Sequence, residues 1–168
     1  CIRDRNMISV AAGMASEGSK AFVYTITPFL VMRAFEQIRV DIGINNQPCV
    51  LVGVGGGLAY DKLGPTHHAY EDLALMQSIP QMNIFVPFDP VSTIDCLEQA
   101  YEKISQTPSY VRLSKGGEPT ILPLQKISKN IYLLYSKNPK NIIITHGSIA
   151  NKLLEFANEH NMECTISV

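Results

Sequence analysis

The 168-residue sequence has no excess of basic residues, because 14 Lys and Arg stand against 15 Asp and Glu, a net charge of −1. Nucleic acids and anionic membranes bind basic surfaces, so we expect neither as a partner. No apolar run reaches the roughly 18–20 residues that a membrane-spanning helix needs; Val50–Val54 is strand-sized. The 46% of apolar residues is enough for a buried core and argues against intrinsic disorder.

The four cysteines form no CxxC pair, so the spacing of a metal site is missing and we predict no metal ligands. We predict that Cys1, Cys49, Cys96 and Cys164 are free thiols, which indicates the reducing cytoplasm. No signal peptide or lipidation motif is visible. Because the sequence starts at Cys1 and not at Met, we expect a processed N-terminus or an interior piece of a longer chain.

Helix-like and strand-like segments alternate along residues 1–115. Hydrophobic spacing and turn residues predict one helix that ends near Gly18 and three more at 28–41, 71–79 and 89–104. Asp89 is the expected N-cap of the last helix. They predict strands at 21–26, 49–54, 83–86 and 109–113, with a long loop at 55–66. This alternation predicts an α/β fold, a mostly parallel sheet with helices on both faces.

The character of the sequence changes after residue 115. Lysines and prolines in 116–138 predict a linker, with a short strand possible at 131–135. Residues 139–168 then predict a strand at 141–145, a helix at 148–160 and a strand at 163–168, the opening of a second α/β domain with a parallel sheet. Two strands and one helix cannot form a stable domain, so we expect that this domain is incomplete here.

The segment from Val52 to His68 is the candidate for chemistry, because it follows a buried strand, where open α/β sheets bind ligands. Its glycines do not open directly into a helix and no Walker lysine follows, so a nucleotide loop is disfavoured. His67 and His68 are either ordinary exposed histidines or functional ones. Asp4 is either a helix cap or a functional carboxylate.

Four blocks of the sequence stand out: Ile2-Arg-Asp-Arg-Asn-Met7 with Ala11–Ala15, Tyr24–Leu30 with Arg33–Arg39, Gly64-Pro-Thr-His-His68 with Glu71-Asp72, and Ile79–Asn83 with Pro87–Pro90. In this order and with this spacing they resemble the pyrimidine-binding domain of the transketolase family of thiamine-diphosphate enzymes, above all split transketolases. They are also similar to blocks of deoxyxylulose-phosphate synthase and the pyruvate dehydrogenase beta subunit. The resemblance covers residues 1–115, and 139–168 resemble the start of the family's C-terminal domain. It implies that the family's first strand, before Ile2, and the rest of the C-terminal domain are missing.

The resemblance implies thiamine diphosphate as cofactor and transfer of a two-carbon ketol unit between sugar phosphates. Asp4 matches the carboxylate that hydrogen-bonds the pyrimidine, a position where the family has Glu. Asp is one methylene, about 1.5 Å, shorter, so we expect weakened cofactor activation. Phe29 matches the aromatic that stacks on the pyrimidine, with Phe35 as second choice. His67 matches the histidine that faces the substrate, and His68 is its weaker neighbour.

Other positions depart from the family. Leu63 stands where many transketolases have a sugar-selecting Asp, and Gly55 where they have a substrate histidine. Lys115 takes the place of a phosphate-binding Arg, and Lys binds phosphate as a point charge and not bidentately. The family's G-D-G…N signature for diphosphate and Mg²⁺ is not in this sequence, so the resemblance implies a diphosphate-binding partner subunit or segment, in a homodimer or heterotetramer.

Two classes of function therefore stay open. One is the pyrimidine-binding half of a transketolase-like enzyme, or of a deoxyxylulose-phosphate-synthase-like or 2-oxo acid dehydrogenase beta-like enzyme. The other is a non-catalytic paralogue that supports assembly. Asp4, Leu63 and Gly55 favour the paralogue, whereas Phe29, Arg33 and the 64–68 turn favour the enzyme.

Overall fold

The computed structural model describes residues 3–103, 106–123, 125–128 and 131–168, so the predictions made for Cys1, Ile2 and Ile104 lie outside the described residues. The chain divides into two compact units. Unit 1 comprises Cys1–Val86 and Asp95–Gly116, and unit 2 comprises Pro87–Ile94 and Gly117–Val168. Over the described part of the chain, no helix has the length and apolar character needed to cross a membrane.

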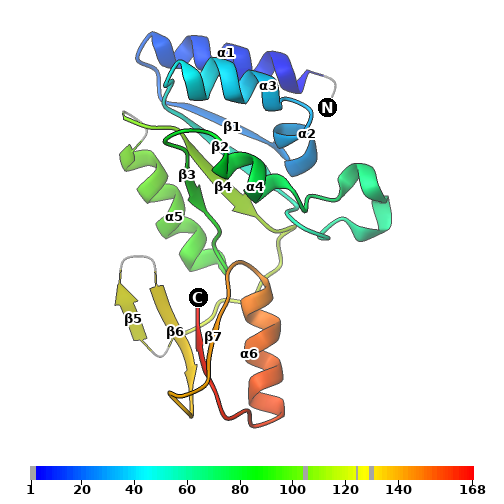
Figure 1. Cartoon of the computed structure of the whole chain (residues 1–168), viewed down its shortest axis with the longest axis vertical. Helices are drawn as coiled ribbons and strands as arrows, with labels where there is room; N and C mark the ends of the chain where they lie inside the picture. The colour runs from blue at the N-terminus through cyan, green and yellow to red at the C-terminus, as the bar shows by residue number, and fades with distance from the viewer. Residues whose placement is uncertain (1–2, 104–105, 124, 129–130) are drawn as a thin grey trace. The chain divides into compact units, whose positions relative to one another are not determined.

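Unit 1 is built on a parallel four-stranded sheet with the order β1-β2-β4-β3 (Figure 1). Its strands are β1 (Ala21–Ile26), β2 (Cys49–Val54), β3 (Asn83–Phe85) and β4 (Ser109–Leu113). The apolar run of β2 is explained by its place inside the sheet, between β1 and β4, where both of its faces are covered. The strands confirm the predicted α/β fold with a parallel sheet.

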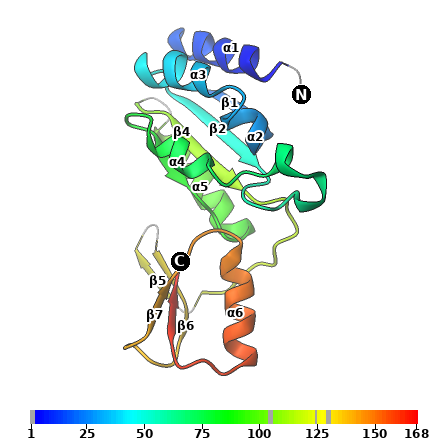
Figure 2. The same ribbon diagram turned by 45° about the vertical axis from the view of Figure 1, so that its right-hand side comes forward.

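Helices cover both faces of this sheet, as predicted. On one face lie α1 (Asp4–Ser16), α2 (Thr27–Val31), α3 (Phe35–Gln37), the π-helix η1 (Ile38–Ile44) and α4 (Asp72–Gln77). Their apolar side chains pack with alternate residues of β1 and β2 in the main core. The opposite face carries α5 (Pro90–Lys103), and Figure 2 shows α1 and α5 on opposite sides of the sheet.

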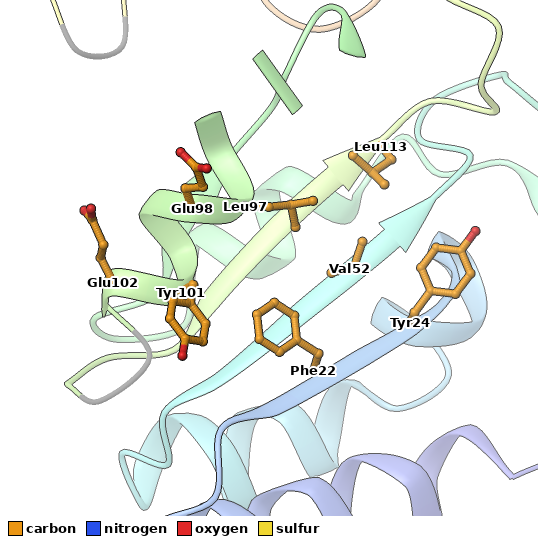
Figure 3. A pocket seen from close by; sticks show the side chains of 8 residues that line it. All are labelled: Phe22, Tyr24, Val52, Leu97, Glu98, Tyr101, Glu102 and Leu113. Atoms are coloured by element: carbon orange, nitrogen blue, oxygen red, sulfur yellow. The ribbon is translucent and has the colours of Figure 1, made fainter. Parts of the chain in front are cut away.

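The α5 face is covered only in part. Val52 of β2 packs in a second core cluster beside α5, but Phe22 and Tyr24 of β1 stay 48% and 63% exposed. With Tyr101 and Leu113 they line an open apolar groove of about 690 Å³ (Figure 3). The alternation of exposed and buried residues along β1 therefore reflects two different faces, one packed and one open.

The helix predicted at 28–41 is not continuous, which corrects the sequence prediction. The chain forms α2, then a turn, then α3 and the π-helix η1. Hydrogen bonds span five residues at this stretch, from Arg33 N to Pro28 O (3.2 Å) and from Gln47 N to Ile42 O (2.8 Å). These wider turns keep Ile38 and Ile42 fully buried, although their spacing also fits an ordinary helix.

Unit 2 contains a mixed four-stranded sheet with the order β5-β6-β8-β7. The predicted β-α-β opening is present as β7 (Ile142–Ile144), α6 (Ile149–Glu159) and β8 (Thr165–Ser167), with β7 and β8 parallel. However, β5 (Gln125–Ser128) and β6 (Ile131–Ser136) join the sheet antiparallel.

Part of the predicted linker 116–138 therefore belongs to this second sheet, and the sheet is not wholly parallel. The physical reason lies in β6, where Leu134 and Tyr135 are buried in the core of unit 2. The hydroxyl of Tyr135 also donates to Met162 O at 3.0 Å. The surrounding lysines and prolines obscured this apolar strand, of which the sequence indicated a short piece at 131–135.

Candidate functional site

Asp4 lies at the first position of α1, where its side chain is fully buried. One carboxylate oxygen, Oδ2, accepts a hydrogen bond from Arg33 Nη1 at 2.9 Å. The other, Oδ1, is buried without a hydrogen-bond partner in the described structure. An unsatisfied buried polar atom costs on the order of 1–3 kcal/mol, and such atoms in native proteins are commonly found where a ligand binds or reacts. Asp4 thus presents one oriented, unused acceptor.

Arg33 also connects the Asp4 carboxylate with a pair of rings, Phe29 and His67. The Arg33 guanidinium carbon lies 4.2 Å from the centroid of the Phe29 ring. Phe29 in turn meets His67 edge-on, with ring centroids 5.0 Å apart and an angle of 69° between the rings. The structure therefore brings together Asp4, Phe29 and His67, three predicted site residues from segments far apart in the sequence. Arg33 is the link between the first two.

His67 is carried by the loop between β2 and α4, which contains two short 3₁₀ turns, η2 (Asp61–Leu63) and η3 (Pro65–His67). Its Nδ1 lies 3.0 Å from the hydroxyl of Thr66. The ring of Tyr60 lies 6.4 Å from the His67 ring, and Lys115 Nζ lies 5.5 Å from the Tyr60 centroid. Successive contacts thus link the carboxylate of Asp4, through Arg33, to the rings of Phe29, His67 and Tyr60 and to the cation of Lys115. We call these six residues the row.

The other two predicted site residues make different contacts. His68 lies with Nε2 3.1 Å from the backbone oxygen of Asp61 and Nδ1 3.2 Å from the hydroxyl of Tyr70. Phe35 is partly buried and packs against the main core of unit 1. A structural role accounts for both sets of contacts, and a binding role for His68 or Phe35 stays a prediction.

Gly55 and Leu63 have clear local settings. Gly55 has a φ of +84°, and a Cβ added there would overlap the ring of Tyr60. A histidine at this position would be strained and would displace Tyr60. Leu63 is 56% exposed on η2, so its side chain is open to solvent.

A buried ionic network lies at the base of the same loop. Asp72, fully buried at the start of α4, accepts hydrogen bonds from the hydroxyl of Tyr110 at 2.8 Å and from Arg112 Nε at 2.7 Å. Arg112 Nη2 is 3.2 Å from the second oxygen of Asp72. Burial, with the Asp72 charge second, raises the pKa of Tyr110 far above its usual range, so Tyr110 stays neutral and donates. The sequence did not reveal this network, because 40 residues separate Asp72 from Arg112.

Comparison with known proteins now places the chain. Residues 1–119 match the family model described as "Transketolase, pyrimidine binding domain". The chain belongs to the transketolase pyrimidine-binding domain family. That family model covers all the site residues described above, from Asp4 to Lys115.

Individual relatives agree with this assignment. The chain is 33% identical over 120 residues to one subunit of the apulose-4-phosphate transketolase of Phocaeicola vulgatus, covering 71% of this chain and 38% of that protein. It is 30% identical over 163 residues to 1-deoxy-D-xylulose-5-phosphate synthase of Haemophilus ducreyi, covering 95% of this chain and 26% of that protein. A split-gene transketolase, solved as an inactive β4 tetramer, matches with a TM-score of 0.78 and 28% identity over 97% of this chain and 52% of that one. The chain thus spans about two fifths or less of the length of these curated relatives.

Family membership implies thiamine diphosphate, and the residues present fit its pyrimidine end. The ring nitrogens of a pyrimidine need a hydrogen-bond partner and its face needs an apolar surface. Asp4 Oδ1 is a buried acceptor without a partner in the described residues, and the Phe29 ring belongs to the same group of contacts. Within the described ranges no cluster of three His, Cys, Asp or Glu side chains could hold a metal ion.

Proposed function

We propose that this chain supplies the pyrimidine-binding half of a thiamine-diphosphate-dependent transketolase-like enzyme, which transfers a two-carbon ketol unit between sugar phosphates. The observation that carries the proposal is the buried, unpartnered Oδ1 of Asp4, joined through Arg33 to the Phe29–His67 pair. A carboxylate that served only as a helix cap would accept from backbone N–H groups, but among the described residues Asp4 Oδ1 accepts from none.

Five residues of the row have a role in this proposal: Asp4, Arg33, Phe29, His67 and Lys115. Asp4 Oδ1 accepts a hydrogen bond from the pyrimidine, while Arg33 holds Oδ2 and so fixes the carboxylate plane. Phe29 covers the pyrimidine face. His67 faces the substrate and positions its hydroxyls or moves a proton there, and Lys115 attracts the phosphate. Thiamine diphosphate, when bound, would supply a reactive thiazolium carbon for the ketol transfer.

The partner and the compartment belong to the same proposal. A second chain or segment holds the diphosphate and Mg²⁺, so that the active species is a homodimer or heterotetramer. Two relatives are each named as one subunit of an apulose-4-phosphate transketolase, and with the split-gene structure they support a separate partner chain. Cys49 and Cys164 are buried free thiols, which supports a cytoplasmic location.

Ketol transfer by the native chain with its diphosphate-binding partner tests this function. We expect slow but measurable transfer between sugar phosphates, and faster transfer for Asp4→Glu, which restores the missing methylene. Asp41→Glu is the matched control: Asp41 is another carboxylate of unit 1, accepts from Ser9 Oγ of α1, and should leave the rate unchanged. If the native complex and Asp4→Glu both transfer nothing, the ketol-transfer proposal is wrong, and if the synthase assay below is also blank, the non-catalytic paralogue replaces it.

A second candidate function is a synthase of the 1-deoxy-D-xylulose-5-phosphate type. The similarity to the Haemophilus ducreyi synthase extends over 95% of the chain and favours this candidate. Assay of the same complex for formation of 1-deoxy-D-xylulose 5-phosphate decides between the two activities. Product formation there without ketol transfer would support the synthase.

A further inference from the structure

The Asp72–Arg112 ion pair is buried directly beneath the loop that carries His67. The Asp72 side chain has no solvent exposure, and that of Arg112 has 17%. With Tyr110, which is also fully buried, three donor atoms converge on one carboxylate. Such a network defines one geometry, because loss of any member leaves buried polar atoms without partners.

Arg112 also contacts the loop itself. Its Nη2 donates to the backbone oxygen of Ala69 at 3.2 Å. Ala69 is bonded to Gly57 in both directions, with Gly57 N to Ala69 O at 2.8 Å and Ala69 N to Gly57 O at 2.9 Å. These bonds close the loop at its base, two residues from His67. Arg112 thus ties the base of the loop to β4.

The close approach of Arg112 explains one glycine of the loop. A Cβ added at Gly56 would lie 2.5 Å from Arg112 Nε, closer than real Cβ atoms come to a neighbour. The absent side chain at residue 56 therefore leaves room for the guanidinium to reach both Asp72 and Ala69. Gly56 N also donates to Leu113 O at 3.0 Å, so loop and strand meet along their backbones as well.

We propose that Arg112 is a positioning residue, which acts with Asp72 to hold His67 in its working place by clamping the base of the 57–69 loop. The inference rests on the proposed function, because it takes from there the role of His67 in substrate binding or proton transfer. A displacement of about 1 Å in a positioned group can cost on the order of 100-fold in rate. Lys cannot replace Arg here, because a point cation cannot bond both Asp72 oxygens and Ala69 O in the same fork.

Amide hydrogen exchange on the native full chain tests the clamp independently of any activity. We expect Arg112→Met to lower the protection of the Gly57 and Ala69 amides by at least about tenfold, since their reciprocal bonds lose their support. Arg112→Lys, which keeps charge and folding, should recover this protection only in part. Val111→Ala is the control: it shortens a buried side chain of the same strand in the second core cluster, and should leave both amides protected. Unchanged protection in both Arg112 variants would overturn the clamp.

Kinetics of the complex with its diphosphate-binding partner test whether the clamp acts through His67. We expect Arg112→Lys to lower kcat/KM on the order of 100-fold in the native background. In the His67→Ala background the same substitution should change kcat/KM by no more than about twofold, the signature of residues that act as one unit. Equal losses in both backgrounds would mean a merely structural role. If the native complex shows no activity, the proposed function fails, and hydrogen exchange alone decides whether the clamp exists.

Discussion

Removal of the Arg33 guanidinium should destabilise the protein by leaving a buried charge alone. In Arg33→Met, Asp4 keeps its carboxylate in a fully buried position, with neither oxygen bonded to a side chain. Breaking a fully buried ion pair costs about 3–5 kcal/mol. The Arg33 side chain is 39% exposed, so water already screens the pair, and the expected loss falls to about 1–3 kcal/mol. Met retains most of the packing on Phe29, which limits the change to the charge.

Urea unfolding of the full chain, followed by far-ultraviolet circular dichroism, measures this loss. Arg39→Met is the matched control, because Arg39 is exposed on η1 and its loss should cost less than about 0.5 kcal/mol. Asp4→Asn added to Arg33→Met should recover most of the stability, since it removes the buried charge. The reasoning is refuted if Arg33→Met is as stable as the native chain, or if Asp4→Asn lowers stability further in its presence.

Three further predictions concern single residues. Asp89 accepts hydrogen bonds from Ser92 N at 2.7 Å and from Ile121 N at 3.0 Å. Asp89→Ala should therefore lower the unfolding free energy of unit 2 by about 2 kcal/mol, and a loss below about 0.5 kcal/mol in urea titrations would contradict this prediction. Burial raises the pKa of Cys49 to about 11, so this thiol should resist alkylation at pH 8 in the folded chain. Its contribution to stability should be full below about pH 8.5 and lost as the pH rises towards 11. Rapid alkylation of Cys49 without unfolding would contradict its burial. Lys115→Met should raise KM for sugar phosphates about tenfold with little change in kcat, and an equal KM in steady-state assays would remove the phosphate role.

The strands of unit 1 were predictable because their apolar runs and the turn residues that bound them indicate the same limits. The β2 segment is an apolar run bounded by Gln47-Pro48 and glycines, typical of a strand with both faces buried. The helical region after Pro28 was predicted in kind but not in detail. Phe29, Met32 and Phe35 fit a period of 3.6, which does not distinguish a continuous α-helix from one interrupted by a π-helix.

The linker prediction was incomplete for a related reason, because it allowed only a short strand at 131–135. Residues 116–138 are rich in lysine and proline, and local composition therefore indicated a loop. The strand β6 pairs with β8 and β5 pairs with β6, and this pairing is a tertiary effect. Local composition reflects the exposed residues of these strands, but it does not indicate that β5 pairs with β6 and β6 with β8.

The candidate site residues could be named where the family resemblance pointed to them, and their roles stay predictions. Asp4, Phe29 and His67 were expected from the family resemblance, and the structure brings them into one set of contacts through Arg33. The network of Asp72 and Arg112 was not expected, since its members lie on two elements far apart in the sequence, α4 and β4, and each is ordinary in its local sequence. The signal that could have indicated it is Arg112 itself, a charged residue in the apolar and largely buried strand β4, which requires a partner.

The most direct test of the account is the affinity of thiamine diphosphate for the complex of this chain with the proposed diphosphate-binding partner, measured by calorimetric titration. A hydrogen bond to a charged group is worth about 1.5–3 kcal/mol, so Asp4→Ala should weaken binding by about 10- to 100-fold, while Asp41→Ala should leave it unchanged. Asp4→Glu should bind at least as tightly as the native chain. Equal affinity for the native chain and Asp4→Ala would contradict the claim that the unpartnered oxygen of Asp4 receives the cofactor.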